Sequence, residues 1–100
     1  MTVPVQGVEH VVLPADLDLA GAPAAKRLLA AALAGPAQTV VVHLDEVEFI
    51  DSSGLRVLVS ATEAAEHRGI DLRILPGRME VMSVVEAAAL AGRLPFVGWP

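Results

Sequence analysis

The sequence contains no cysteine, so disulfide bonds, thiolate catalysis and cysteine-ligated metal sites are excluded. It has no tyrosine and is only 3% aromatic, which removes the stacking platforms of single-stranded nucleic-acid binders. The net charge of −5 provides no positive field for a phosphate backbone. No segment approaches the roughly 18 consecutive apolar residues of a membrane span, and the N-terminus lacks the pattern of a signal peptide. We therefore expect a cytoplasmic protein without nucleic-acid or direct membrane binding.

The 100 residues suffice for one domain, 1–100, with a single core. Strand signals occur at 1–13, 39–44 and 70–75, and a last short strand is predicted at 94–97. The first segment reads as one strand or a short hairpin, which leaves antiparallel pairing of the first strands open. Residues 39–44 are almost continuously apolar, as in a strand covered on both faces. Residues 70–75 alternate, as in a strand near a sheet edge.

Three helices are predicted from apolar spacing at i, i+3 and i+4. The first begins at Pro23 and ends before Gly35, the second spans 53–67 with Gly69 as its left-handed C′ residue, and the third ends near Gly92. Their inner faces are predicted to be Ala25, Leu28, Leu29, Ala32 and Leu33; Leu55, Leu58, Val59 and Thr62; and Val81, Val84, Val85, Ala88 and Ala89. The predicted fold is α/β, with about three helices packed on a mixed, mostly parallel sheet.

Most chemistry-bearing patterns are absent. His10, His43 and His67 have no metal-ligand spacing and are interpreted as structural. The acidic loop, residues 45–51, lacks the spacing of a calcium loop, so a solvated acidic rim is favoured over a cation site. There is no glycine-rich phosphate loop, no GxSxG elbow and no histidine placed by the sequence as a base. No catalytic residue, metal or cofactor is predicted, and the protein is not expected to be an enzyme.

The remaining candidate is the turn Asp51-Ser52-Ser53-Gly54, between an apolar segment and the second helix. Aspartate and serine are common N-caps, because their oxygens accept the free N–H groups of a first helical turn, and on its own this interpretation is favoured. However, one cap needs one side chain, and here an acid and two hydroxyls occur together. A serine at a helix start is also open to partners and tolerates a phosphate.

Residues 40–61, VVVHLDEVEFIDSSGLRVLVSA, resemble the signature of the STAS family of bacterial anti-sigma-factor antagonists. The resemblance implies a STAS-like fold for the whole chain and places the phosphorylated serine of that family on Ser53. It also implies partner switching. The unphosphorylated antagonist binds an anti-sigma factor that is a serine kinase, phosphorylation releases it, and a PP2C-type phosphatase restores it.

The resemblance implies a partner-binding set consisting of Asp51, Ser52, Ser53, Gly54, Leu55 and Arg56. Within it, Asp51 and Ser52 are expected to shape and cap the turn, and Gly54 to leave room for a partner. Arg56 departs from the glycine frequent in the family, and could pair with a phosphate on Ser53 or with a partner's carboxylates. His43 also departs from the family's Asp or Asn, and Trp99 has no assigned role.

Two alternatives remain open. The chain could be a non-switching STAS module, acting as a scaffold in a sensory complex or as a transporter accessory, with the turn serving only as interface and cap. An enzyme or nucleotide-binding domain has the least support, because the base, metal cluster and phosphate loop that it requires are missing from the sequence.

Overall fold

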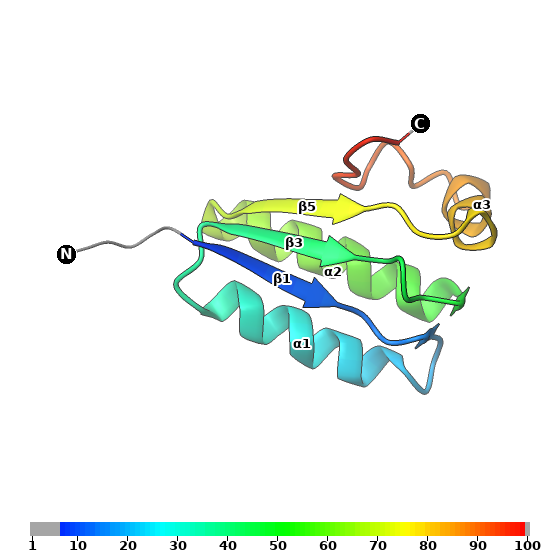
Figure 1. The fold of residues 1–100 in the computed structure, drawn as a ribbon, viewed down its shortest axis with the longest axis horizontal. Coiled ribbons are helices and arrows are strands. Elements are labelled where there is room, and N and C mark those ends of the chain that lie inside the picture. The colour runs from blue at the N-terminus through cyan, green and yellow to red at the C-terminus, as the bar shows by residue number, and fades with distance from the viewer. Residues whose placement is uncertain (1–6, 100) are drawn as a thin grey trace.

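Two parallel sheets of unequal size organise the chain, whose residues 7–99 are described by a computed structural model (Figure 1). The elements in chain order are β1 (Val8–Val12), β2 (Asp16–Leu17), α1 (Ala22–Ala34), β3 (Thr39–His43), β4 (Phe49–Ile50), α2 (Ser52–Arg68), β5 (Asp71–Leu75) and α3 (Met79–Ala87). The larger sheet has the order β1-β3-β5, and β2 pairs with β4 beyond it. The predicted α/β fold is confirmed.

The strand pairings among the described residues are all parallel. A parallel pair needs a crossover connection, which α1 supplies between β1 and β3, and α2 between β3 and β5. The hairpin left open for the N-terminus involves residues 1–6, which lie outside the described part. The two-residue strands β2 and β4 were not predicted, because so short a segment carries no readable period.

Helices α1 and α2 lie side by side on one face of the larger sheet (Figure 1). Val40 and Val42 of β3 point into the core that they enclose and are fully buried. Burial of a valine or leucine side chain contributes about 1.5–3 kcal/mol, so this layer supplies most of the hydrophobic stabilisation. The predicted inner face of α1 is confirmed except for Leu28, which is 46% exposed. A stripe of four buried positions is enough for a helix covered on one side.

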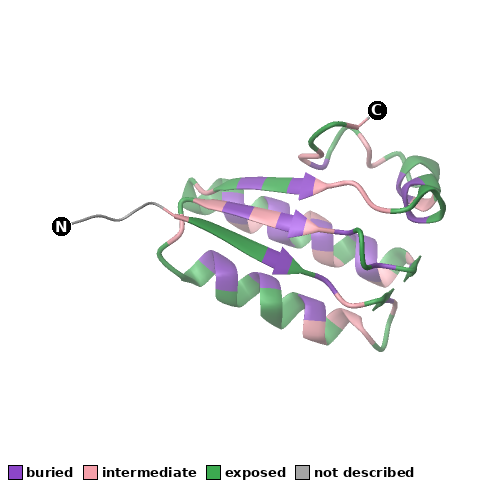
Figure 2. Ribbon diagram, in the orientation of Figure 1, coloured by how far each residue is buried: buried purple, intermediate pink, exposed green. Residues whose placement is uncertain are grey.

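None of the helices within residues 7–99 covers the opposite face of the larger sheet, and Figure 2 shows most of β1 as exposed. Val8 and Val12 are more than half exposed, and Val41 is only partly buried. The prediction that the strand at 39–44 is covered on both faces is therefore wrong. The apolar character of β3 reflects its central position between two strands as well as its single buried face.

The helix ends agree with the sequence in α2 but not in α3. Gly69 adopts the predicted left-handed conformation with φ of 68°, and its N–H bonds back to the last turn of α2. Helix α3 ends at Ala87 and not near Gly92, and Ala89 has a positive φ of 60°. Ala88 and Ala89 are exposed, so no apolar burial extends the helix across them.

The C-terminal segment runs beside β5 (Figure 1). The strand predicted at 94–97 is reduced to one parallel bridge between Ile74 and Phe96. Leu94 is buried, and Trp99, for which the sequence suggested no role, is partly buried against the core. This segment therefore protects the outer side of β5, which is the last strand of the larger sheet.

Candidate functional site

The turn between β4 and α2 is fixed by the carboxylate of Asp51. This residue is the N-cap of α2, and its Oδ1 accepts hydrogen bonds from the N–H of Ser53 at 2.9 Å and of Gly54 at 3.4 Å. Its backbone carbonyl accepts from the N–H of Leu55 at 3.0 Å, and its own N–H donates to the carbonyl of Leu17 at 3.2 Å. One carboxylate thus satisfies two of the four N–H groups that a helix leaves free at its start.

The two serines occupy the first two positions of α2. Ser52 is exposed and Ser53 is partly buried. The side-chain hydrogen bonds that hold the turn come from Asp51, and neither serine hydroxyl bonds to another described residue. The expectation that Ser52 shares the cap is therefore not met. Both hydroxyls remain available for chemistry or for a partner.

Gly54 and Leu55 are buried, in contrast to the serines before them. A Cβ atom added to Gly54 would lie 2.2 Å from the carbonyl oxygen of Leu17 and 2.9 Å from Cγ1 of Ile50. Glycine is therefore needed here so that α2 can pack directly on β2 and β4. Its structural role is internal packing, and any contribution to a partner surface is made through the shape of the turn.

Arg56 lies one turn further along α2 and is exposed. Residues three apart on a helix are neighbours, so its guanidinium is within reach of the side chain of Ser53. The ion pairs between described residues join other groups, including Arg78 and Glu48 at 3.8 Å. Arg56 takes part in none of these pairs. It is a cation beside the turn that has not been neutralised by a described acid.

The acidic rim, which we define as Asp45, Glu46 and Glu48, precedes the turn and is exposed. Val47, which lies between these acids, and Ile50, which follows them, are buried. The carboxylates therefore point to solvent because the alternating apolar side chains fix the loop in the core.

Phe49, although aromatic and next to the buried Ile50, is 52% exposed. It is paired with Asp16 in the β2–β4 ladder. Two further apolar side chains nearby in the fold are even more open: Leu19, which follows β2, is 78% exposed, and Met79, at the start of α3, is 80% exposed. We call Leu19, Phe49 and Met79 the apolar rim. β2, β4 and the start of α3 lie together at the carboxyl end of the larger sheet (Figure 1).

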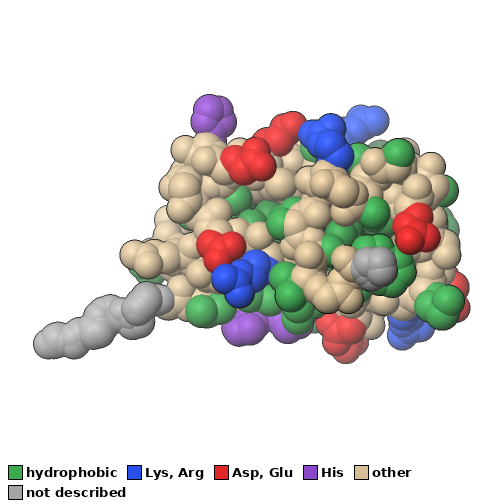
Figure 3. Space-filling view, turned by 90° about the horizontal axis from the view of Figure 1, so that it is seen from above, with side chains coloured by type: hydrophobic (Ala, Val, Ile, Leu, Met, Phe, Trp, Pro, Cys, Tyr) green, Lys and Arg blue, Asp and Glu red, His purple; other side chains and the backbone are tan. Residues whose placement is uncertain are grey.

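The charges on the view in Figure 3 are scattered over the surface, and in places an acidic side chain lies directly beside a basic one. On the open sheet face, Arg73 Nη2 lies 2.8 Å from Asp71 Oδ2. The hydrogen bond to Asp71 and then the charge of that carboxylate raise the pKa of Arg73 above its ordinary value. This exposed pair lies on the open sheet face and is not part of the turn.

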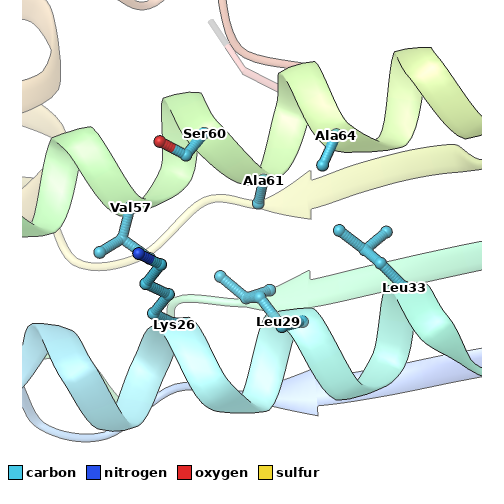
Figure 4. A pocket seen from close by; sticks show the side chains of 8 residues that line it. Lys26, Leu29, Leu33, Val57, Ser60, Ala61 and Ala64 are labelled. Carbon is cyan, nitrogen blue, oxygen red and sulfur yellow. The ribbon is translucent and has the colours of Figure 1, made fainter.

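A hollow with a volume of about 200 Å³ lies between α1 and α2 (Figure 4). Its walls are aliphatic side chains, including Leu29, Leu33 and Val57, and its polar side chains are Lys26 and Ser60. It contains neither serine of the turn, and no acid or histidine lines it. The hollow follows from the short alanine side chains where the two helices meet.

The histidines are arranged in a way that sequence spacing did not reveal. His10 Nδ1 lies 2.8 Å from His43 Nε2, although the two residues are 33 positions apart. Only the parallel register of β1 and β3 could have predicted this contact. His67 lies alone in the last turn of α2, where a positive charge would suit the helix dipole. Within residues 7–99 no group of three or more histidine or acidic side chains is placed to hold a metal ion.

Comparison with known proteins identifies the family. The STAS domain family matches residues 2–97. The chain belongs to the STAS domain family. A search of curated protein sequences returned no significant match.

Two solved structures resemble this STAS domain. The anti-sigma factor antagonist SpoIIAA in its unphosphorylated form has a TM-score of 0.74 and 17% identity, over 95% of this chain and 82% of that chain. The Bacillus cell fate determinant SpoIIAA in the phosphorylated form has a TM-score of 0.67 and 16% identity, over 95% of this chain and 85% of that chain. At this identity the likeness establishes a common fold. No helix among the described residues has the length and apolar character needed to cross a membrane.

Proposed function

We propose that this STAS domain is a cytoplasmic anti-sigma factor antagonist in bacteria, controlled by phosphorylation of Ser53. In this proposal the unphosphorylated chain binds an anti-sigma factor, which is a serine kinase, and the phosphorylated chain is released. A PP2C-type phosphatase then removes the phosphate. The chain itself performs no catalysis and needs no cofactor.

The observation that carries the proposal is the geometry of the turn. Ser53 has a hydroxyl that bonds to no other described residue, while Asp51 provides the cap that a serine would otherwise supply. The turn is therefore complete without the serine hydroxyl, and a modification of Ser53 removes no hydrogen bond that holds the fold. This separation of the cap from the modified group suits a switch that acts on binding and not on folding.

The electrostatic energies at the helix start also support a switch that acts on binding and not on folding. A phosphate carries about −1.5 to −2 charges at neutral pH. The dipole of α2 stabilises an anion at its N-terminus by about 0.3–1 kcal/mol, while two unit charges 4 Å apart in water repel by about 1 kcal/mol. Attraction by the dipole and repulsion by Asp51 are thus comparable and opposite, so we expect little net change in the free energy of unfolding. Against an acidic or apolar partner surface, nothing offsets the added charge.

The apolar rim provides exposed apolar side chains that a partner protein could bury. Exposed aromatic and large aliphatic side chains are frequent anchors of protein interfaces, and Phe49 precedes Asp51 by only two residues. A partner that covers Phe49 also approaches Ser53. The proposed partner surface consequently includes the apolar rim together with Ser52 and Arg56, the two exposed residues of the partner-binding set that the family resemblance implies.

The direct test is phosphosite mapping. The full chain is used to co-purify its kinase, then incubated with that kinase and ATP, and the product is analysed by mass spectrometry. We expect one phosphate on Ser53, its loss in Ser53→Ala, and its retention in the matched variant Ser52→Ala. Phosphate on Ser52 alone, or none at all with a kinase that binds the chain, would contradict the proposal.

A second function is favoured by one feature of the same turn. Because Asp51 already satisfies the N–H groups of Ser53 and Gly54, the turn needs no phosphate to be a stable interface. This suits a non-switching STAS module that acts as a scaffold or as a transporter accessory. The two functions are distinguished by Ser53→Asp, which should weaken binding at least tenfold in a switch and leave it nearly unchanged in a scaffold.

A further inference from the structure

Two histidine rings from neighbouring strands meet on the open face of the larger sheet. His10 of β1 is in register with Val41, and Val12 is in register with His43 of β3. Alternate residues of a strand point to the same side, so both rings stand on the face that carries no helix. Their ring centroids are 5.1 Å apart and their planes are inclined by 41°. His10 Nδ1 and His43 Nε2 point at each other across 2.8 Å.

Asp45 lies beside the ring nitrogen of His43 that does not face His10. Its Oδ1 lies 3.8 Å from His43 Nδ1, on the opposite side of the ring from His10. A carboxylate there favours a proton on Nδ1 and so leaves a lone pair on His43 Nε2. His10 Nδ1 then donates the single hydrogen of the pair. When that proton moves to the other nitrogen of the exposed His10 ring, both nitrogens of the contact carry a lone pair.

We propose that His10 Nδ1 and His43 Nε2 form a bidentate site for a borderline divalent metal ion such as Zn²⁺, Ni²⁺ or Cu²⁺. Imidazole nitrogen suits these ions, and Zn–N bonds of 2.0–2.1 Å in a tetrahedral site separate two ligand nitrogens by about 3.3 Å. From their present contact of 2.8 Å the two nitrogens have to separate by about 0.5 Å, and the rings have to tilt so that both lone pairs are directed at one ion and not at each other. His10 is exposed and free to make this adjustment.

Asp45 has a positioning role in this site. A histidine that ligates a metal commonly donates its other N–H to a carboxylate, which fixes the ring and raises its basicity. The side chain of His43 is only 23% exposed, and the Asp45 carboxylate lies 3.8 Å from its second nitrogen, so a small approach of this exposed carboxylate would complete the hydrogen bond. Asp45 faces the nitrogen that is turned away from His10, so it supports the ligand and does not bind the same ion.

The site is open, since two protein nitrogens leave the remaining coordination positions to water or to a group from another molecule. Asp71, on the same face, is held by Arg73 through bonds of 2.8 and 3.1 Å and is not a competing ligand. Mg²⁺ and Ca²⁺ prefer oxygen ligands and should not bind two neutral imidazoles. The site is separate from the serine turn, so its failure or success does not depend on the proposed function.

The test is calorimetric titration of the full chain with ZnCl₂ and NiCl₂, and with CaCl₂ as a control. We expect one Zn²⁺ or Ni²⁺ per chain and no Ca²⁺ binding. Affinity should fall at least tenfold in His10→Ala and in His43→Ala, and 10–100-fold in Asp45→Asn. His67→Ala, which removes the histidine of α2, should leave it unchanged. Far-UV circular dichroism checks that each variant is folded.

Nitrogen NMR of the imidazole rings provides an independent measurement on the unmodified chain. Zn²⁺ should shift His10 Nδ1 and His43 Nε2, while the His67 ring stays unaffected. Three results would overturn the proposal: no heat of binding with either metal, an equal loss of affinity in His67→Ala, or unchanged binding in a folded His10→Ala/His43→Ala double variant. A ratio of one metal to two chains would also contradict a site built within one chain.

Discussion

The starts of α1 and α2 differ, although both helices cover the same face of the same sheet. At α1, Gly21 is the N-cap and provides no side-chain bond, and Pro23 in the first turn has no N–H to satisfy. The nearby Asp18 accepts the N–H of Gly21 on its side-chain Oδ1 and the N–H of Ala22 on its backbone carbonyl, both at 2.8 Å. At α2, the carboxylate of Asp51 accepts two N–H groups and the buried Gly54 locks the first turn onto Leu17.

This difference shows what a regulated helix start requires. Both starts are held by an acid and a close backbone contact, since a Cβ at Gly21 would lie 1.9 Å from the Asp16 carbonyl oxygen, and a Cβ at Gly54 2.2 Å from that of Leu17. What distinguishes α2 is that its first turn also carries two serine hydroxyls, which bond to no described residue and have no structural task. The proposed switch needs a well-held helix start whose hydroxyls are free to react.

The largest effect should come from Gly54→Ala. The new Cβ would lie 2.2 Å from the Leu17 carbonyl oxygen, and backbone cannot yield as a side chain can. We expect the free energy of unfolding to fall by about 2 kcal/mol or more, since overpacking typically costs about 1–3 kcal/mol. At about 4–8 °C per kcal/mol, melting should occur about 10 °C lower.

The matched control for this substitution is Gly92→Ala. No atom lies within 4 Å of a Cβ at that position, so the melting temperature should stay nearly constant. Equal melting temperatures for the two alanine variants would show that the close contact beneath the turn is unimportant.

Phe49→Ala should reduce binding without reducing stability. The side chain is half exposed, so its removal should change the free energy of unfolding by about 0.5 kcal/mol or less. If the apolar rim anchors the partner, affinity should fall at least tenfold, as for an interface hot spot. Surface plasmon resonance with the co-purified anti-sigma factor measures this. Leu28→Ala, a similarly exposed position on α1, is the control and should bind normally.

Asp51→Ala should destabilise the fold by about 1 kcal/mol, the usual cost of a lost N-cap. Asp51→Asn should restore most of this stability, because asparagine caps equally well without the charge. Urea denaturation of the two variants provides the comparison. If the alanine variant were as stable as the asparagine variant, the two bonds from Asp51 could not be what holds the turn.

The smallest effect concerns Arg56. Arg56→Gln should leave the unphosphorylated chain unchanged, because Arg56 pairs with no described acid. In the Ser53 phosphoform the substitution should lower the free energy of unfolding by about 0.3–0.5 kcal/mol, the value of an exposed ion pair on a helix. The difference should vanish at high salt. A salt-independent difference would mean that Arg56 acts through packing.

The sequence was informative wherever a signal was local. The period of the two long helices, the Gly69 stop and the alternation of residues 70–75 each depend on neighbouring residues, and the structure confirms them. The DSSG turn could be placed at a helix start for the same reason. The three-dimensional roles within it could not, since Gly54 is determined by its contact with Leu17, 37 positions earlier.

The features that the sequence did not predict share one cause: each depends on how separate segments are placed in three dimensions. Phe49 is as apolar as its buried neighbour Ile50, yet the two-residue pairing of β2 with β4 turns them to opposite sides. The open sheet face and the contact between His10 and His43 depend on register between separate strands. No pattern within a single segment carries that information.

The central claim is that a phosphate on Ser53 changes binding and not folding. The most direct measurement compares the unphosphorylated chain with its Ser53 phosphoform in two parallel assays: calorimetric titration with the co-purified anti-sigma factor, and thermal melting followed by far-UV circular dichroism. We predict that affinity falls at least tenfold while the melting temperature shifts by only a few degrees. Extensive unfolding of the phosphoform, or equal affinity of the two forms, would contradict the account.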